Sequence, residues 1–168
     1  MRIIAGEKKG RIIFSVPKSM FVKPISSRIR QSLFDILRPR VPGSIFLDLY
    51  AGVGTVGLEA LSRGSRNAVF VEKEGICVKI IEKNIKHLDF SSKARVLKAD
   101  VMSGLEWLKH FSMYEGYDII FLGPPYRDEN NIPLEYGSKT LELISVSDLF
   151  APDGIAVLQQ RGHHPEFF

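Results

Sequence analysis

The stretch Phe46-Leu-Asp-Leu-Tyr-Ala-Gly-Val-Gly-Thr-Val-Gly57 decides the fold of this chain. It begins in an apolar run of strand-forming residues and bends through Gly52, Gly54 and Gly57. It then continues as Leu58-Glu-Ala-Leu61, which is typical of a helix. Between a strand and a helix, the motif Gly-x-Gly-x-x-Gly lets the backbone bend sharply and lets a nucleotide-like ligand approach the main chain. We therefore predict a ligand site at this turn.

Two carboxylates indicate which ligand the turn would bind. Asp48 lies just before the glycines, where a dinucleotide site would hold a diphosphate, and its charge would repel phosphate and attract a cation. Glu72 follows at the end of the next predicted strand, about where an acidic residue takes a ribose diol. A cationic, ribose-bearing ligand without phosphate fits S-adenosylmethionine better than NAD. A purely structural turn is the alternative.

Strands and helices alternate along the rest of the chain. Strands are predicted at residues 45–49, 68–72, 94–98, 117–122 and 155–159, and helices at 54–62, 75–88, 101–110 and 138–144. This alternation predicts an α/β fold with a mostly parallel sheet and helices on both faces. Asp48, Glu72, Asp100 and Pro124 each follow a strand, so we expect them to line one rim of the sheet.

The first 40 residues differ in charge from the rest of the chain. They hold ten lysine and arginine residues but only two acidic ones, Glu7 and Asp35. We predict a small hairpin over residues 2–16 and a helix over 27–37 with Ile29, Leu33, Phe34 and Leu37 on its buried face. This basic extension (1–40) precedes a single globular unit (41–168). A basic arm favours a polyanion partner, and the predicted phosphate-binding residues are Lys8, Lys9, Arg11, Lys23, Arg28 and Arg30.

Composition limits the remaining possibilities. The chain has 168 residues, 45% of them hydrophobic, and a net charge of +4, which suits one domain with its own core. Cys77 is the only cysteine, which excludes a disulfide framework and a cysteine metal site and favours a reducing compartment. His163 and His164 lack carboxylate or cysteine company, so we predict no metal. No apolar run approaches the roughly 20 residues of a membrane span. We expect a cytoplasmic monomer.

A second chemical motif, Gly123-Pro124-Pro125-Tyr126, follows the apolar strand at residues 117–122. The two prolines fix the backbone and remove two N–H donors, which leaves carbonyl acceptors pointing outward. The tyrosine offers a flat ring. An exocyclic amine of a nucleic acid base needs such acceptors and such a platform. These four residues are the predicted catalytic residues, although a stiffened loop or an amine target in DNA or protein would also fit the tetrapeptide.

The chain resembles a known family through these motifs. Asp48-x-Tyr-Ala-Gly-x-Gly-x-x-Gly57-Leu-Glu-Ala-Leu-Ser-Arg-Gly64, Phe70-Val-Glu72-Lys and Pro124-Pro125-Tyr126 are similar to the RsmD-like bacterial methyltransferases. The openings Met1-Arg-Ile-Ile-Ala-Gly6-x-x-x-Gly10-Arg11 and Lys23-Pro-x-x-x-Arg28-x-Arg30-x-x-Leu33-Phe34 also resemble that family. The likeness covers nearly the whole chain, and its N-terminal part is the most specific. It implies that residues 41–168 have the Rossmann-like class I S-adenosylmethionine-dependent methyltransferase fold.

The resemblance implies methylation of the N2 amine of a guanine in small-subunit (16S) ribosomal RNA, either free or in an assembling subunit, with S-adenosylmethionine as cofactor. It implies that Asp48 and the glycines border the methionine portion of the cofactor, that Glu72 takes the ribose hydroxyls, and that Asp100 contacts the adenine. The cofactor-binding residues implied in this way are Asp48, Ala51, Gly52, Gly54, Gly57, Glu72, Asp100 and Val101.

Three departures from the family pattern affect these expectations. Gly123 stands where the family has Asp or Asn, and losing one polar group from a catalytic site commonly costs roughly a hundredfold in rate. A weakened or non-catalytic RNA-binding relative is therefore the alternative function. Ile25 replaces a usual threonine. The chain also ends soon after the strand at 155–159, so we expect the family's last hairpin to be missing and the sheet edge to be open.

Overall fold

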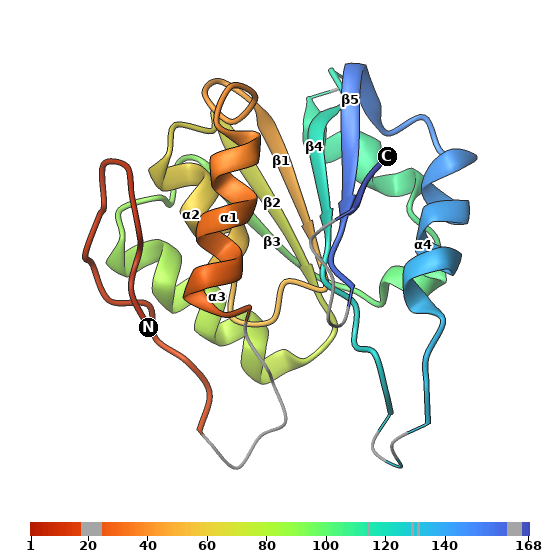
Figure 1. Ribbon diagram of the computed structural model, residues 1–168, viewed down its shortest axis with the longest axis horizontal. Helices are drawn as coiled ribbons and strands as arrows, with labels where there is room; N and C mark the ends of the chain where they lie inside the picture. The colour runs from red at the N-terminus through yellow and green to blue at the C-terminus, as the bar shows by residue number, and fades with distance from the viewer. Residues whose placement is uncertain (18–24, 114, 129, 131, 161–165) are drawn as a thin grey trace.

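The computed structural model describes residues 1–17, 25–113, 115–128, 130, 132–160 and 166–168. This part of the chain forms a six-stranded sheet in the order β3-β2-β1-β4-β5-β6 (Figure 1). Strands β1 to β5 run parallel, and β6 is antiparallel to β5. The strands are β1 (Ile45–Leu49), β2 (Asn67–Glu72), β3 (Ala94–Lys98), β4 (Tyr117–Leu122), β5 (Phe150–Leu158) and β6 (Glu166–Phe167).

Helices connect the strands and cover the sheet. The α-helices are α1 (Ser27–Leu37), α2 (Thr55–Ser62), α3 (Gly75–His87) and α4 (Tyr136–Ser145), and the 3-10 helices are η1 (Val101–Ser103) and η2 (Glu106–Ser112). Helices α1, α2 and α3 lie over one face and α4 over the other (Figure 1). None of the described helices has the length and apolarity needed to cross a membrane. The arrangement confirms the predicted α/β class with a mostly parallel sheet.

Strand β1 is the centre of the molecule and is buried on both faces. All five of its residues are buried. Phe46 packs in the apolar cluster shared with α1, α2 and α3, whereas Leu47 and Leu49 pack in the cluster shared with η1, η2 and α4. Because successive side chains of a strand point to opposite faces, only a continuous apolar run can supply both clusters. Asp48 is the one carboxylate in that run, which makes its position informative.

Helix α1 begins as predicted but buries a different set of side chains. The Ser26 hydroxyl caps it by accepting from the Ile29 N–H at 3.2 Å. Phe34 and Leu37 are buried as expected. Ile29, however, is 38% exposed and Arg30 is fully buried in its place. One step along a helix turns the side chain by about 100°, so the buried face lies slightly to one side of the face that the apolar pattern indicates.

The hairpin predicted in residues 2–16 is present and packs against α2. An isolated antiparallel bridge joins its two arms. The Glu59 carboxylate of α2 accepts from the backbone N–H groups of Ile4 and Ala5, both at 2.9 Å. Gly6 has a φ of +83°, and a Cβ there would lie 1.7 Å from the Ser62 carbonyl oxygen. Glycine at this position therefore allows the hairpin to lie directly on the end of α2.

Two expectations about local structure are wrong. The helix expected over residues 101–110 is instead the pair η1 and η2, because Gly104 separates them with a φ of +106° that interrupts the helical path. The strand expected at residues 155–159 begins earlier, because β5 starts at Phe150 and runs through Pro152-Asp153-Gly154. Asp153 has a φ of +62°, and the register with β4 shifts between Tyr117 and Ile119. The turn-forming residues thus produce a bulge instead of ending the strand.

The edge of β5 that we expected to be open is paired. Strand β6 runs antiparallel to β5, with Leu158 opposite Glu166 and Val157 opposite Phe167. Ala156 and Phe168 exchange two backbone hydrogen bonds of 2.9 Å. The last residues of the chain therefore satisfy backbone groups that would otherwise be exposed at this edge.

Candidate active site

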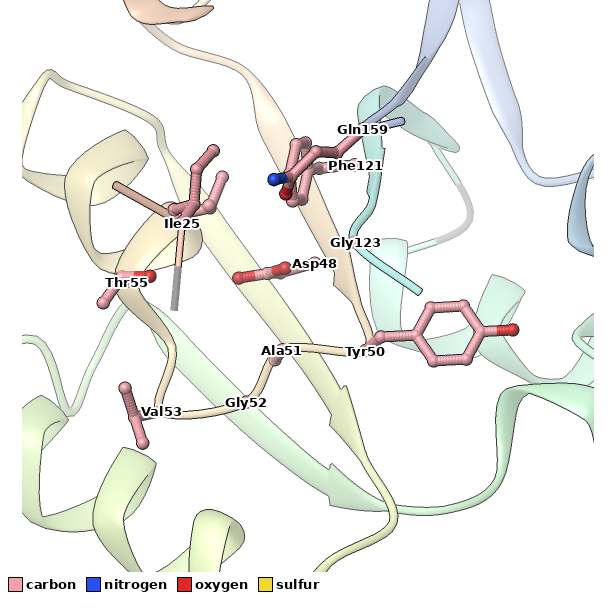
Figure 2. Close-up of a pocket in the computed structure, with 11 residues that line it drawn as sticks. Ile25, Asp48, Tyr50, Ala51, Gly52, Val53, Thr55, Phe121, Gly123 and Gln159 are labelled. Atoms are coloured by element: carbon pink, nitrogen blue, oxygen red, sulfur yellow. The ribbon is translucent and has the colours of Figure 1, made fainter. Parts of the chain in front are cut away.

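A hollow opens where the carboxyl ends of β1 and β4 lie side by side. The two strands are in register at Leu49 and Leu122, so the segments that follow them emerge together. The hollow is partly open to solvent. It is lined by Ile25, Asp48, Tyr50, Ala51, Gly52, Val53, Thr55, Val56, Phe121, Gly123 and Gln159 (Figure 2). The two motifs selected from the sequence thus meet in one place.

The glycine turn has the geometry that its residues predict. Gly52 and Gly54 have positive φ angles of 58° and 82°, and Gly54 is the N-cap of α2. Gly57 lies one turn into the helix, where a Cβ would be only 2.3 Å from Cε1 of Phe70 on β2. The third glycine therefore allows helix α2 to pack directly on the sheet, which brings the start of the helix to the end of β1.

Asp48 is held in the hollow with one carboxylate oxygen unused. Its side chain is 1% exposed, and Oδ2 accepts from the Gly57 N–H at 2.9 Å. Oδ1 has no hydrogen-bonding partner among the described residues. Burial raises the pKa of this carboxyl to about 8, the Gly57 N–H opposes the rise, and the charge of Glu72 adds to it. A buried oxygen without a donor is unfavourable, and a cationic donor would stabilise it.

Glu72 connects the glycine turn to the end of β2. Its Oε2 accepts from the Gly52 N–H at 2.7 Å, and its Oε1 accepts from the Glu74 N–H at 2.8 Å. Its backbone carbonyl also accepts from the Ala99 N–H at 3.1 Å, which brings the end of β3 alongside. Glu72 is buried beside the hollow without lining it. The carboxylate is therefore positioned by backbone groups at the rim.

The remaining predicted cofactor residues continue along the same rim. Asp100 follows β3, is exposed, and accepts from the Met102 N–H at 2.9 Å. Val101 is buried in the apolar cluster beneath it. Asp48, Ala51 and Gly52 line the hollow itself. The structure therefore places the predicted cofactor residues in a row along the carboxyl ends of β1, β2 and β3.

The predicted catalytic tetrapeptide borders the other side of the hollow. Gly123 lines it, and its N–H donates to the Leu49 carbonyl at 3.3 Å. Pro124 is buried and Pro125 is exposed. Tyr126 is half-buried, its hydroxyl donates to the Gln159 carbonyl at 3.1 Å, and burial raises the pKa of the phenol. The tetrapeptide and the end of β5 are therefore linked.

Several residues around the hollow were missed by sequence reasoning. Gln159 follows β5, the strand next to β4, and the carboxyl-end rule that selected Asp100 and Pro124 would also have selected it. Tyr50 has a φ of 61°, its ring stacks on Tyr136 at 6.3 Å, and its hydroxyl lies 2.6 Å from that of Thr140. Burial raises the Tyr50 pKa to about 12. No sequence signal indicates that an aromatic pair borders this site.

The predicted phosphate-binding residues do not form one group. Lys8 pairs with Asp89 at 3.3 Å, and the Arg11 guanidinium donates to the His87 carbonyl at 2.8 Å. Both contacts lie at the carboxyl end of α3, opposite the rim. Lys9 is exposed on the same hairpin. Arg28 is exposed at the start of α1, the end of that helix nearest the hollow. Lys23 lies outside the described residues.

Arg30 must be removed from the predicted phosphate-binding residues. Its side chain is fully buried, its Nε lies 3.5 Å from Oε2 of Glu59, and its Nη2 donates to the Arg2 carbonyl at 2.7 Å. Desolvation lowers the Arg30 pKa, and the Glu59 carboxylate opposes that change. Arg63 binds the same carboxylate at 2.8 Å. The pattern of charges along α1 suggested a surface contact, whereas Arg30 joins the hairpin, α1 and α2 from inside.

The fold and the rim define the class of this protein. Strand order, helices on both faces and a glycine turn at the end of β1 are those of a Rossmann-like class I S-adenosylmethionine-dependent methyltransferase. An O-methyltransferase from Bacillus cereus solved in complex with SAH shares the fold with a TM-score of 0.60 at 15% identity, covering 80% of this chain and 57% of that one. No group of three or more metal-binding side chains is found within the described ranges.

The family model described as conserved hypothetical protein 95 matches residues 1–167, and the chain belongs to this family, the RsmD family. Ribosomal RNA small subunit methyltransferase D of Haemophilus influenzae is 35% identical over 167 residues, which is 98% of this chain and 81% of the relative. A solved hypothetical protein of Thermus thermophilus has a TM-score of 0.77 at 33% identity, covering 94% of this chain and 84% of that one.

Proposed function

We propose that this protein transfers a methyl group from S-adenosylmethionine to the exocyclic N2 amine of a guanine in small-subunit ribosomal RNA. The observation that carries the proposal is the buried Oδ1 of Asp48, which faces a hollow shared with Gly123 and has no partner in the described residues. The similar Haemophilus influenzae protein is a ribosomal RNA small subunit methyltransferase, which supports the choice of RNA.

The residues at the rim fit the cofactor. Oδ1 of Asp48 would accept from its cationic portion, and the backbone of Ala51, Gly52 and Gly54 would border the methionine part. Glu72 would take the ribose hydroxyls, while Asp100 and Val101 would border the adenine. When bound, S-adenosylmethionine supplies a methyl carbon whose bond to sulfur breaks as the amine nitrogen bonds to it, the electron pair staying on sulfur. The nitrogen then loses one proton to water.

The tetrapeptide would position the target amine. The Gly123 and Pro124 carbonyls would accept its protons, and Tyr126 would offer its ring to the extruded base. Orientation is the main contribution that such a site makes, because the methyl group needs no further activation. The ring of Tyr126 is restrained because its hydroxyl is tied to the Gln159 carbonyl.

The basic residues support a long substrate. Arg28 lies at the hollow's end of the molecule, whereas Lys8, Lys9 and Arg11 lie beyond the far end of α3. A helix of 13 residues is about 20 Å long, so an RNA that touches both groups must extend well past the target base. An RNA folded in an assembling small subunit satisfies this requirement, and binding should weaken as salt rises.

The test is to map methylated guanines in ribosomal RNA from a strain lacking the protein. We expect one guanine of the small subunit to lose its N2 methyl group and to regain it when the purified protein, small subunits and S-adenosylmethionine are mixed. Naked ribosomal RNA and DNA serve as comparison substrates. Methylation of DNA or protein alone would refute the RNA assignment. Cofactor binding without any transfer would favour the alternative suggested by Gly123, a non-catalytic RNA-binding relative.

A further inference from the structure

Gly123 has no side chain, and the side chain of Gln159 lies next to the place where one would begin. A Cβ built on Gly123 would lie 3.1 Å from Cε1 of Phe121 and 3.7 Å from Oε1 of Gln159. Gln159 comes from a different strand, since it directly follows β5, where Leu158 is paired with Leu122. The carboxamide of Gln159 thus lies next to the position where a side chain at residue 123 would begin.

The backbone holds Gln159 in this place from two sides. Its N–H donates to the Leu122 carbonyl at 2.9 Å, which continues the pairing of β4 and β5. Its carbonyl accepts from the Tyr126 hydroxyl at 3.1 Å. The position of Gln159 is therefore fixed relative to the predicted catalytic tetrapeptide.

The backbone of Gln159 is fixed, whereas its side chain is not used by the described residues. The carboxamide makes no hydrogen bond to the other described residues, and it lines the same hollow as the Asp48 carboxylate (Figure 2). In the view of Figure 2, Gln159 and Phe121 are drawn above Asp48, on the same side of the hollow. A polar group that is unpaired in a binding hollow is available to a ligand.

We propose that Oε1 of Gln159, which lies beside Gly123 in the hollow, is the side-chain acceptor for the target amine. This inference rests on the proposed function. A carboxamide oxygen accepts one N–H of the amine and so turns the nitrogen lone pair toward the methyl group. The same oxygen stabilises the positive charge that develops on nitrogen during transfer. Gln159 is then a catalytic residue, and Gly123 does not by itself make the protein inactive.

The arrangement also explains why restoring the family residue at position 123 is not expected to help. An added Cβ meets Phe121 at 3.1 Å, which is tighter than an ordinary contact, and the rest of an Asn side chain would compete with the Gln159 carboxamide for space. We therefore expect Gly123→Asn to leave the rate unchanged or to lower it. A large increase in rate for Gly123→Asn would contradict the assignment of Gln159.

The main test uses Gln159→Met, which keeps the length of the side chain and removes its acceptor. We expect kcat for methyl transfer to small subunits to fall by about 10- to 100-fold, with an unchanged KM for S-adenosylmethionine. The control is Gln160→Met, the same change one residue along, at a position that does not line the hollow. Calorimetry with S-adenosylhomocysteine should give the same affinity in the parent and both variants. If that affinity falls together with kcat in Gln159→Met, the role is structural and the proposal is wrong.

A binding measurement separates this inference from the proposed function. Two synthetic RNAs are compared, one with guanine and one with inosine at the mapped position, because inosine lacks the N2 amine. The parent should bind the guanine RNA roughly 3- to 10-fold more tightly, and Gln159→Met or Gln159→Ala should remove that preference. An equal preference in parent and variants would overturn the role of Gln159. A parent that methylates no guanine would overturn the proposed function itself, and this inference with it.

Discussion

Replacing Asp48 with asparagine should make the protein more stable and, at the same time, a poorer binder of its cofactor. Asparagine has the same shape, and its amide oxygen can still accept from the Gly57 N–H, as Oδ2 does at 2.9 Å. What changes is the ability to ionise. In the parent, burial raises the pKa of Asp48 from 3.8 to about 8, so the folded protein keeps a proton that the unfolded chain releases above about pH 4.

The size of the effect follows from that difference in pKa. Because the folded state binds more protons between pH 3.8 and about 8, the free energy of unfolding falls as pH rises through this window, by about 1.4 kcal/mol per pH unit. The loss amounts to about 2 kcal/mol at pH 5 and about 4 kcal/mol at pH 7, and it levels off above the folded pKa at about 6 kcal/mol. Asp48→Asn escapes this loss, so it should exceed the parent's stability by up to these amounts.

Urea unfolding followed by circular dichroism at pH 5, 7 and 9 measures the difference. We expect the midpoint of the variant to lie above that of the parent, with a gap that widens between pH 5 and 7 and hardly changes from about pH 8 upward. The slope of the transition should be the same for both proteins, because they bury the same surface. A gap that is absent, or that narrows as pH rises, would show that Asp48 ionises as an ordinary carboxyl and that the reasoning about its burial is wrong.

The same variant tests the ligand. Oδ1 of Asp48 is expected to accept from a cationic group, and a hydrogen bond to a charged group is worth about 1.5 to 3 kcal/mol. Asp48→Asn should therefore bind S-adenosylmethionine roughly 10- to 100-fold more weakly in calorimetry at about pH 8. An unchanged affinity would exclude Asp48 from the cofactor site, whatever its effect on stability.

Three further substitutions test the fold and the RNA surface. Gly57→Ala should lower the free energy of unfolding in urea by about 2 kcal/mol or more, because the added Cβ would lie 2.3 Å from the Phe70 ring. An unchanged urea midpoint would mean that α2 does not pack tightly on Phe70. Arg30→Met should lower the free energy of unfolding by about 3 kcal/mol, because the buried Arg30 contacts Glu59, and it should leave RNA affinity unchanged. Weaker RNA binding by the folded variant would return Arg30 to the phosphate-binding residues. Arg28→Ala should keep the thermal midpoint and reduce the slope of log affinity against log salt by about 1, and an identical slope would remove Arg28 from the RNA surface.

The sequence predicts the centre of this molecule well because the decisive chemistry there is local. The apolar run of β1 can be buried only inside a sheet covered on both faces. Gly57 is needed because Phe70 on the neighbouring strand β2 leaves no room for a Cβ. The expected meeting of the glycine turn with residues 123–126 also follows from one rule, that parallel strands end at the same rim. These predictions follow from short motifs and from this rule, without any particular side-chain contact being predicted.

The predictions that were wrong depend on contacts that a linear pattern does not contain. Arg30 is basic and near the start of α1, but its environment is decided by Glu59 on α2. The helix expected over residues 101–110 has the right composition, yet Gly104 divides it. Gln159 was missed and not wrongly predicted: the rule that parallel strands end at one rim would have selected it, but its place beside Gly123 depends on how β5 pairs with β4.

Two buried carboxylates have different roles in this protein. Glu59 holds the N-terminal extension in place, and Asp48 faces the hollow. Glu59 receives backbone N–H groups of the hairpin together with Arg30 and Arg63. A buried carboxylate with this many donors is fully compensated, whereas Asp48, also buried, is left with a free oxygen among the described residues. Glu59 belongs to α2 and Asp48 accepts from the Gly57 N–H of the same helix, so the difference does not come from where they lie in the core. The molecule satisfies the carboxylate that holds its extension in place and leaves unsatisfied the one that faces the hollow, as expected where a ligand completes the site.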